Sequence, residues 1–226
     1  MHPHGILPVH ACLWAAFCDQ YLGPDVYGFG AVASVVMTMP IVRHVVGWLT
    51  CVPADYTNIE NGMKGVCPPA NLAGRRPQNL YILPGGVAEV FTSCMSEDVV
   101  VCKSRKGLFK IAIESDARIV PVYCFGANKM FYSLGDMGVL GSVSRRIRAT
   151  ITLFWGRFGL PIPLSPKVSM AMGTPLEPPV IGNKEDPKAM DDAVVEYRNA
   201  YLEELQKTFD TYKAAAGYPD AKLEIR

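Results

Sequence analysis

The sequence lacks the features that would assign it to several large classes of protein. Only 19% of its residues are charged and its formal net charge is +1, so it has no basic footprint of the kind that binds nucleic acid. Its seven cysteines include no C-x-x-C pair, which argues against a zinc knuckle or a disulfide framework and favours reduced thiols facing the cytosol. The first ten residues, MHPHGILPVH, have no charged start and no long apolar run, so no secretory signal is indicated.

What the sequence does contain is apolar residues. Half of the chain is hydrophobic and the mean hydropathy is +0.15, which is high for a soluble enzyme and low for a protein with many membrane spans. The most hydrophobic stretch, residues 26–49, is interrupted by Pro40, Arg43 and His44. We predict a buried helix followed by a second short helix in this stretch. The alternative is a pair of helices that contacts a lipid surface.

Residues 79–125 alternate between the patterns of strands and helices. NLYILP, VVVCK and ARIVPVYCFG are apolar, β-branched runs, whereas residues 106–115 carry their apolar side chains at helical spacing. A longer helix begins at Asp186 and Pro187 and ends at Gly217. We therefore predict an α/β fold with a mixed central sheet flanked by helices, in a single domain that spans residues 1–226.

Two of the four histidines lie in the tetrapeptide His2-Pro3-His4-Gly5. Proline restricts the backbone between the two imidazoles, and glycine allows a tight turn or the close approach of a substrate. A histidine held in this way can remove a proton from an alcohol at neutral pH. The alternative is a surface loop without catalytic function.

A second candidate follows the NLYILP strand, in Pro84-Gly85-Gly86 and the nearby Glu89. Backbone N–H groups at Gly85 and Gly86 can stabilise an oxyanion. Glu89 can orient an imidazole and stabilise its protonated form. The alternative is an ordinary connection between a strand and a helix, with a glutamate in solvent.

A third candidate is Arg105-Lys106-Gly107 together with Lys110, at the start of a predicted helix. Cations at the N-terminus of a helix oppose its dipole unless an anion is bound there. The phosphates of coenzyme A would fit such a site. The alternative is that the lysines simply extend into solvent.

In this combination the sequence resembles the type 2 diacylglycerol acyltransferases and their monoacylglycerol and wax-ester relatives. The shared blocks are HPHG, the P-x-x-R of MPIVRH, PGGVAE, SRKGLFKIAI with RIVPVYCFG, and GRFGLPIPLSP leading to VSMAMGTPLEPP. They occur in the order found in that family and cover essentially the whole chain. HPHG alone is modestly specific, but all the blocks in order are highly specific.

The resemblance implies an acyltransferase fold related to the glycerophosphate acyltransferases, with the histidine motif opposite the glycine turn. Those relatives use an H-x-x-x-x-D pair and an arginine-containing block that holds a phosphate. Here Leu7 and Val9 occupy the aspartate position relative to the two histidines, and the turn is uncharged. This difference favours a neutral lipid as the acceptor.

The expected reaction is direct transfer of the acyl group from acyl-CoA to a hydroxyl, most simply that of diacylglycerol. We expect His4 to be the general base, with His2 as the second candidate, and Glu89 to orient the imidazole. We expect no metal and no cofactor besides the substrate acyl-CoA. A membrane surface is an expected partner, at the cytosolic face of the endoplasmic reticulum or on lipid droplets.

Two departures from the family pattern are visible. In the family an apolar strand and a hydrophobic membrane hairpin precede HPHG, and we expect this chain to lack both. The family often has a glutamate and an asparagine after the F-G of the last strand, where this chain has Ala127 and Asn128. Two other functions remain open: a non-catalytic lipid-binding or regulatory fragment, and a metal hydrolase that uses both histidines and Glu89 as ligands.

Overall fold

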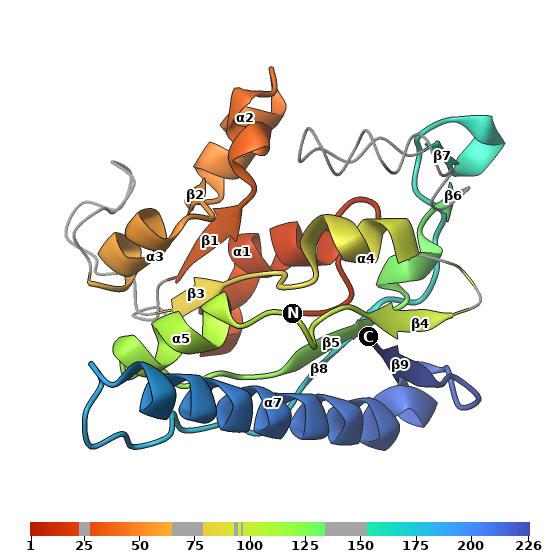
Figure 1. Cartoon of the computed structure of the whole chain (residues 1–226). Helices are drawn as coiled ribbons and strands as arrows, with labels where there is room; N and C mark the ends of the chain where they lie inside the picture. Colours follow the sequence, from red (N-terminus) through yellow and green to blue (C-terminus); the bar gives the residue numbers. More distant parts are fainter. Residues whose placement is uncertain (23–27, 65–78, 93–94, 96, 134–152) are drawn as a thin grey trace. The chain divides into compact units, whose positions relative to one another are not determined.

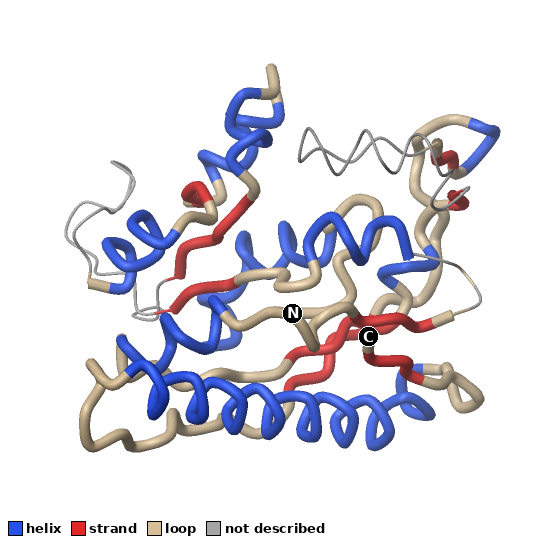
Figure 2. Tube along the Cα trace, viewed as in Figure 1, coloured by secondary structure: helices blue, strands red, loops and turns tan. Residues whose placement is uncertain are grey.

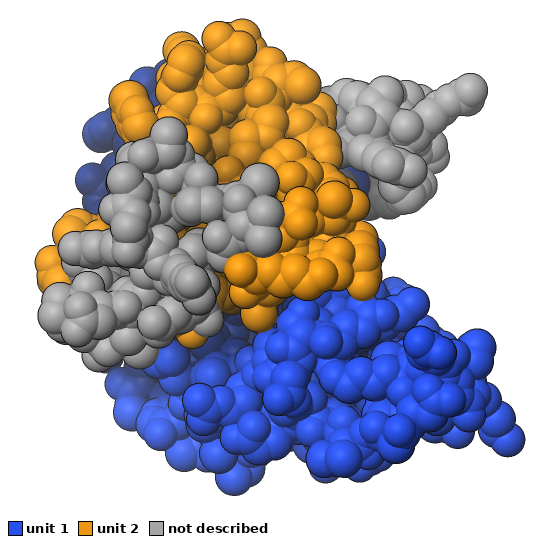
Figure 3. Space-filling model, turned by 90° about the vertical axis from the view of Figure 1, so that its left-hand side faces the viewer, with its two compact units in different colours: residues 1–7, 84–226 blue, residues 8–83 orange. Residues whose placement is uncertain are grey.

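The computed structural model describes residues 1–22, 28–64, 79–92, 95, 97–133 and 153–226. The chain divides into two compact units, which Figure 3 colours separately. Unit 1 contains Met1–Leu7 and Pro84–Arg226, and unit 2 contains Pro8–Leu83. Both units combine helices with short strands, so the predicted α/β class is confirmed. The prediction of a single domain stays a prediction.

Unit 2 is built around a parallel three-stranded sheet with the order β2-β1-β3. Gly30 in the central strand pairs with Cys51 on one side and Tyr81 on the other. Parallel strands need crossover connections, and the segments between these strands include helices. The elements are α1 (Val9–Leu22), β1 (Gly28–Val32), η1 (Ser34–Thr38), α2 (Val42–Trp48), β2 (Cys51–Pro53), α3 (Tyr56–Met63) and β3 (Asn79–Tyr81).

The buried helix predicted within residues 26–49 is wrong. Gly28–Val32 forms the strand β1, and the following η1 and α2 are short helices on either side of Pro40. Only Val46 of α2 is buried. Proline interrupts the helical hydrogen-bond ladder, and the β-branched residues before it also suit a strand. Among the described helices, none is both long enough and apolar enough to cross a bilayer.

In its described residues, unit 1 contains three small two-stranded sheets rather than the one central sheet that the sequence predicts. β4 and β9 are parallel, whereas β5 with β8 and β6 with β7 are antiparallel. The elements are α4 (Gly86–Thr92), β4 (Asp98–Val100), α5 (Gly107–Glu114), β5 (Val122–Phe125), η3 (Ala127–Lys129), β6 (Tyr132–Ser133), β7 (Phe154–Trp155), η4 (Arg157–Gly159), β8 (Ser169–Met172), α7 (Pro187–Ala216) and β9 (Leu223–Ile225).

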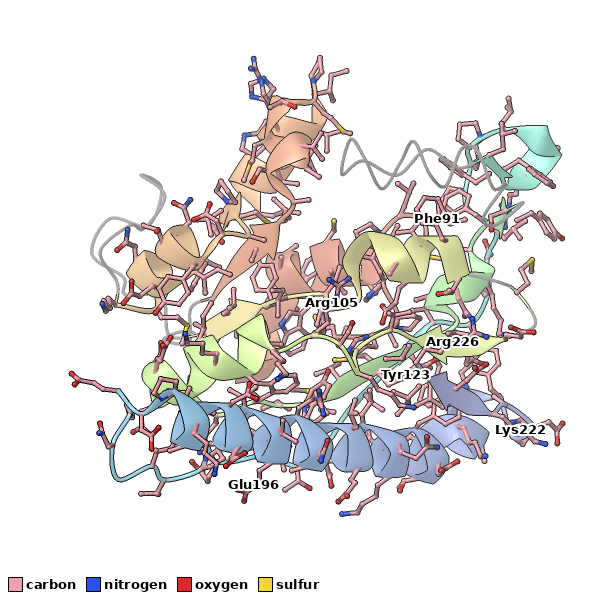
Figure 4. All side chains as sticks on the ribbon, viewed as in Figure 1. Phe91, Arg105, Tyr123, Glu196, Lys222 and Arg226 are labelled. Atoms are coloured by element: carbon pink, nitrogen blue, oxygen red, sulfur yellow. The ribbon has the colours of Figure 1, made fainter. Side chains whose placement is uncertain are left out.

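The long helix α7 forms one wall of the core of unit 1. Its predicted ends are confirmed, because the Asp186 side chain accepts a hydrogen bond from the N–H of Lys188 and Gly217 adopts a left-handed φ of 96°. Figures 1 and 2 show it running beside α5 and the strands β5 and β8, against which it packs. Its outer face is exposed to solvent, and Glu196 points away from the strands (Figure 4).

The inner face of α7 packs against aromatic side chains. The rings of Phe209 and Tyr123 meet edge to face with their centroids 4.8 Å apart, and Phe109 contacts Tyr201 at 5.5 Å. Such pairs add specific geometry to the burial of apolar area. Leu205 lies between these contacts along the helix and is fully buried. This core supports β5, the strand on which the candidate site is built.

Truncating Leu205 tests this packing. We expect Leu205→Ala to lower the free energy of unfolding by about 2–5 kcal/mol, because it removes a buried side chain and leaves a cavity. Denaturation by urea, followed by circular dichroism, measures the change. Glu203→Ala, at an exposed position of the same helix, is the control and should change the free energy by no more than about 0.5 kcal/mol. If the two variants changed the free energy of unfolding equally, Leu205 would not be packed in the core as described.

Candidate active site

The histidine tetrapeptide lies along one edge of β5. The N–H of His2 donates to the carbonyl of Val122 at 2.8 Å, and the N–H of Cys124 donates to the carbonyl of His2 at 2.7 Å. The other edge of β5 pairs with β8. Gly5 has a φ of +64°, and a Cβ there would lie 3.0 Å from the carbonyl oxygen of Ala127. These backbone contacts hold the segment in place beside β5, so the alternative of a surface loop does not describe it.

Glu89 is the group around which the site is organised. Its carboxylate is buried and accepts from Nδ1 of His2 at 2.5 Å, from the N–H of His4 at 2.7 Å and from the N–H of Val101 at 3.0 Å. The three donors come from the N-terminal segment and from Val101, the residue after β4, while Glu89 itself lies on α4. One carboxylate thus joins three separate stretches of unit 1.

These contacts decide the charge of Glu89. Burial alone would raise the pKa of the carboxyl group, but the charge and hydrogen bond of His2, with the N–H groups of Val101 and His4, outweigh it. The net effect is a pKa below the ordinary value. Hydrogen bonds to the charged form of an acid favour that form. Glu89 is therefore an ionised acceptor at neutral pH.

The glycine turn fits closely against this carboxylate. A Cβ on Gly85 would lie only 1.9 Å from Cδ of Glu89, so no larger residue fits there without moving the glutamate. Gly86 has a φ of +54°, a conformation that side chains disfavour. Arg105, labelled in Figure 4, donates from Nη2 to the carbonyl of Gly85 at 3.1 Å. α4 begins at this turn and its first N–H groups have no acceptor within the helix; the oxyanion role of the two glycines stays a prediction.

The two imidazoles have different surroundings. His2 is fully buried, and its Nε2 has no partner among the described residues. His4 is only partly buried, and its Nδ1 lies 2.8 Å from the carbonyl oxygen of Gly5. A carbonyl can only accept, so Nδ1 of His4 carries the hydrogen and Nε2 keeps a lone pair. Burial lowers the pKa of His4, with the Gly5 hydrogen bond opposing it, so the imidazole is neutral at pH 7.

The hydrogen bond that the sequence argument assigns to Glu89 and a base imidazole therefore goes to His2. Toward His4 the carboxylate contacts only the backbone N–H. It positions the residue without touching the ring. The sequence alone could not separate these cases, because the two histidines stand two positions apart and either ring could face Glu89.

The predicted coenzyme A residues are only partly brought together with this site. Lys106 pairs with Asp191 of α7 at 2.7 Å, and Lys110 lies 3.8 Å from Glu114, one turn further along α5. Both lysine side chains are about half exposed. Gly107 begins α5 and a Cβ there would meet nothing within 4 Å. The lysines thus already have carboxylate partners, and their role in binding acyl-CoA stays a prediction.

One buried network beneath the site was not predicted. Asp98 accepts from the hydroxyl of Tyr123 at 2.8 Å and from Nδ2 of Asn128 at 3.2 Å. Tyr123 also bridges to His2 through the backbone (Figure 4 labels Tyr123). The network therefore joins β4 to the strand that carries the histidine segment. The only sequence signal was an aspartate at the start of an otherwise apolar strand.

The metal-hydrolase alternative gains no support from the donor geometry. No three His, Cys, Asp or Glu side chains within the described ranges converge as metal ligands. The Glu89 oxygens point at N–H donors, and Nδ1 of His4 is directed at a carbonyl. A metal at these atoms would have to displace those hydrogen bonds.

Comparison with known proteins gives the family of this chain. The family model described as diacylglycerol acyltransferase matches residues 1–226. The chain belongs to the diacylglycerol acyltransferase family. The family resemblance read from the sequence blocks is therefore confirmed. No solved structure matches the chain.

Several curated proteins are similar to this chain. Human diacylglycerol O-acyltransferase 2 is 26% identical over 243 residues, covering 98% of this chain and 58% of the human protein. The Dictyostelium discoideum protein of the same name is 31% identical and covers 94% and 64%. Bovine 2-acylglycerol O-acyltransferase 1 is 26% identical and covers 99% and 67%. The chain therefore spans about three fifths of the length of the first two relatives.

Adding one carbon to Gly85 tests the carboxylate site. We expect Gly85→Ala to lower the free energy of unfolding by about 2 kcal/mol or more, because the new methyl displaces Glu89 from its buried donors. Thermal and urea denaturation measure the loss. Gly182→Ala is the matched control, since a Cβ there meets nothing within 4 Å. If Gly85→Ala proved as stable as the control, the turn would not be locked by the glutamate.

Proposed function

We propose that this chain transfers a fatty acyl group from acyl-CoA to the free hydroxyl of a neutral lipid, most simply diacylglycerol. The observation that carries the proposal is His4, whose Nδ1 hydrogen is directed at Gly5 and whose backbone is held by Glu89. This leaves Nε2 as a neutral base on a fixed loop. Membership of the diacylglycerol acyltransferase family supports the same reaction.

In the proposed reaction, Nε2 of His4 takes the proton of the acceptor hydroxyl while its oxygen attacks the thioester carbonyl. The tetrahedral intermediate then collapses, the carbon–sulfur bond breaks, and the proton passes from His4 to the departing thiolate of coenzyme A. General base catalysis of this kind requires a neutral imidazole near the operating pH. The lowered pKa of His4 meets that requirement.

His2 and Glu89 act as positioning residues in this proposal. Their hydrogen bond is buried, and neither side chain is accessible to solvent. They hold the backbone of His4, so that its ring needs little reorganisation when the substrates bind. The N–H groups of Gly85 and Gly86 are proposed to meet the oxyanion, with Arg105 ordering the turn through the Gly85 carbonyl.

Direct transfer is favoured over an acyl-enzyme on cysteine. Burial raises the pKa of the Cys102 thiol to about 11 and that of Cys124 to about 12. Both thiols are therefore protonated at neutral pH, and a thiol is a much weaker nucleophile than a thiolate. These two cysteines lie next to the site, since Cys124 pairs with His2 through the backbone and Cys102 follows Val101.

The partners follow from the same proposal. The glycine turn carries no arginine of its own, which fits an uncharged acceptor, and monoacylglycerol or a long-chain alcohol would serve as well as diacylglycerol.

Lys106 and Lys110 are proposed to meet the phosphates of acyl-CoA by exchanging their present carboxylate partners. A neutral lipid dissolves in a bilayer, so we propose the cytosolic face of the endoplasmic reticulum or lipid droplets as the location. A fold related to the glycerophosphate acyltransferases is part of the proposal and is supported by the mixed α/β architecture.

Acyl transfer by His4 variants tests the function. With labelled acyl-CoA and diacylglycerol in detergent micelles, we expect His4→Ala to lower the transfer rate by about a hundredfold to ten-thousandfold. The unfolding free energy should change little, because the His4 ring is partly exposed and its removal leaves the Glu89 donors in place. His2→Ala is the contrasting variant, and we expect it to cost about 3–5 kcal/mol of stability, since it leaves a buried charge without its partner.

Product formation that persists in His4→Ala would refute the base assignment. No transfer by the unmodified chain, to diacylglycerol, monoacylglycerol or a long-chain alcohol, would favour a non-catalytic lipid-binding protein instead. A loss of stability in His4→Ala as large as that in His2→Ala would show that both histidines serve the fold.

The pH dependence of transfer gives a separate prediction. Protonation removes the base, so kcat/KM should be constant near neutral pH and should fall as the pH drops through the folded pKa of His4. Because burial lowers that pKa, we expect the midpoint to lie below 6.5, the ordinary value for histidine. Steady-state kinetics between about pH 5 and 8 would measure it, with His44→Gln, at an exposed position, as the control that keeps the same midpoint. A midpoint at or above the ordinary value would contradict the assignment.

A further inference from the structure

Unit 2 exposes a cluster of large apolar side chains around α2. Ile41 is 77% exposed and Trp48 is 76% exposed. Three more residues of the segment are also exposed, so that α2 and the residues just before it present several apolar side chains to the surface. We define the α2 apolar patch as Met39, Ile41, Val42, Val45 and Trp48.

The way α2 packs within unit 2 does not account for this patch. The helix contacts η1 and β2 (Figure 1), and Val46 alone among its residues is buried. Scattered exposed apolar residues are normal, but a contiguous cluster usually marks a binding surface. The α2 residues that point away from η1 and β2 are therefore a candidate binding surface.

The charges around the patch indicate the chemistry of that occupant. Residues 28–54 contain no aspartate or glutamate, and they do contain Arg43 and His44, both exposed. Within the described ranges Arg43 contacts His44 and makes no ion pair with a carboxylate. A surface that is apolar and carries an unopposed cation is complementary to anionic phospholipid headgroups above acyl chains.

We propose that the α2 apolar patch inserts into the headgroup and upper acyl region of an anionic phospholipid membrane. Trp48 and Ile41 enter the acyl boundary, and Arg43 meets lipid phosphate. Tryptophan is enriched at this depth because its ring is apolar and its indole N–H remains near water. The purpose of this membrane contact rests on the proposed function, since the enzyme has to reach an acceptor that is dissolved in the membrane. Its physical basis is the exposure of the apolar side chains and the charge of Arg43.

Binding to vesicles tests the patch in the whole chain. We expect sedimentation with vesicles of phosphatidylcholine and phosphatidylserine to fall roughly a hundredfold in Ile41→Ser with Trp48→Ser, at about tenfold for each large apolar side chain. Arg43→Gln should weaken binding about fivefold, and high salt should abolish that difference. Val180→Ser is the matched control, because Val180 is fully exposed and lies in unit 1, outside the patch.

Trp48 gives a second readout of the same contact. Lipids brominated on their acyl chains should quench the fluorescence of the unmodified chain, and Trp48→Phe should remove most of that quenching while binding is kept. The substituted positions are exposed, so circular dichroism should show unchanged folding. Wild-type binding by the double serine variant, or quenching unaffected by Trp48→Phe, would overturn the proposal. So would a dimer in light scattering that the double variant converts to a monomer, because the patch would then join two copies of the chain.

Acyl transfer measured in detergent micelles separates this inference from the proposed function. The double serine variant should transfer at the unmodified rate there, because the acceptor is already dispersed. Transfer without vesicle binding would overturn the α2 patch and leave the enzyme assignment standing. Vesicle binding through the patch without acyl transfer would support the α2 patch and refute the proposed acyltransferase function.

Discussion

The carboxylate of Glu89 is the constraint on which unit 1 depends. A buried charge is costly unless its oxygens are hydrogen-bonded, and here the donors are the ring of His2 and the backbone at His4 and Val101. The hydrogen bonds to this carboxylate bring the N-terminal segment, α4 and the chain after β4 together. The position of His4 follows from it, so a single electrostatic requirement of the fold also prepares the candidate catalytic group.

The elements around this point were largely predictable from local signals. The ends of α7 follow from Asp186, Pro187 and Gly217, because capping and termination depend on residues close in sequence. α5 lies within the segment predicted from its helical spacing. The pairing of a histidine with Glu89 was also predicted. The choice of His2 as the partner was not, because it depends on which way each ring leaves a backbone that is paired to β5.

The features that the sequence did not reveal share a physical cause, which is that long-range partners leave no local trace. The ion pair of Lys106 with Asp191, 85 positions away, is one of them, although the predicted role of Lys106 in binding acyl-CoA stays a prediction. Residues 26–49 looked like a buried helix, because hydrophobicity reports the preference of a side chain for leaving water and not the neighbour that receives it. For Ile41 and Trp48 that neighbour is absent from the described part of unit 2. Asp98 was missed for the same reason, since its partners come from β5 and η3.

The close fit of Gly85 against Glu89 has a consequence for how this site can evolve. No space remains between Gly85 and the carboxylate of Glu89. A methyl group at position 85 is therefore tolerated only if the acid at position 89 becomes shorter. Aspartate in place of Glu89 would free that space, but it would draw the oxygens away from the donors that now surround them. The two positions are thus epistatic, because a side chain can be added at position 85 only together with a change at position 89.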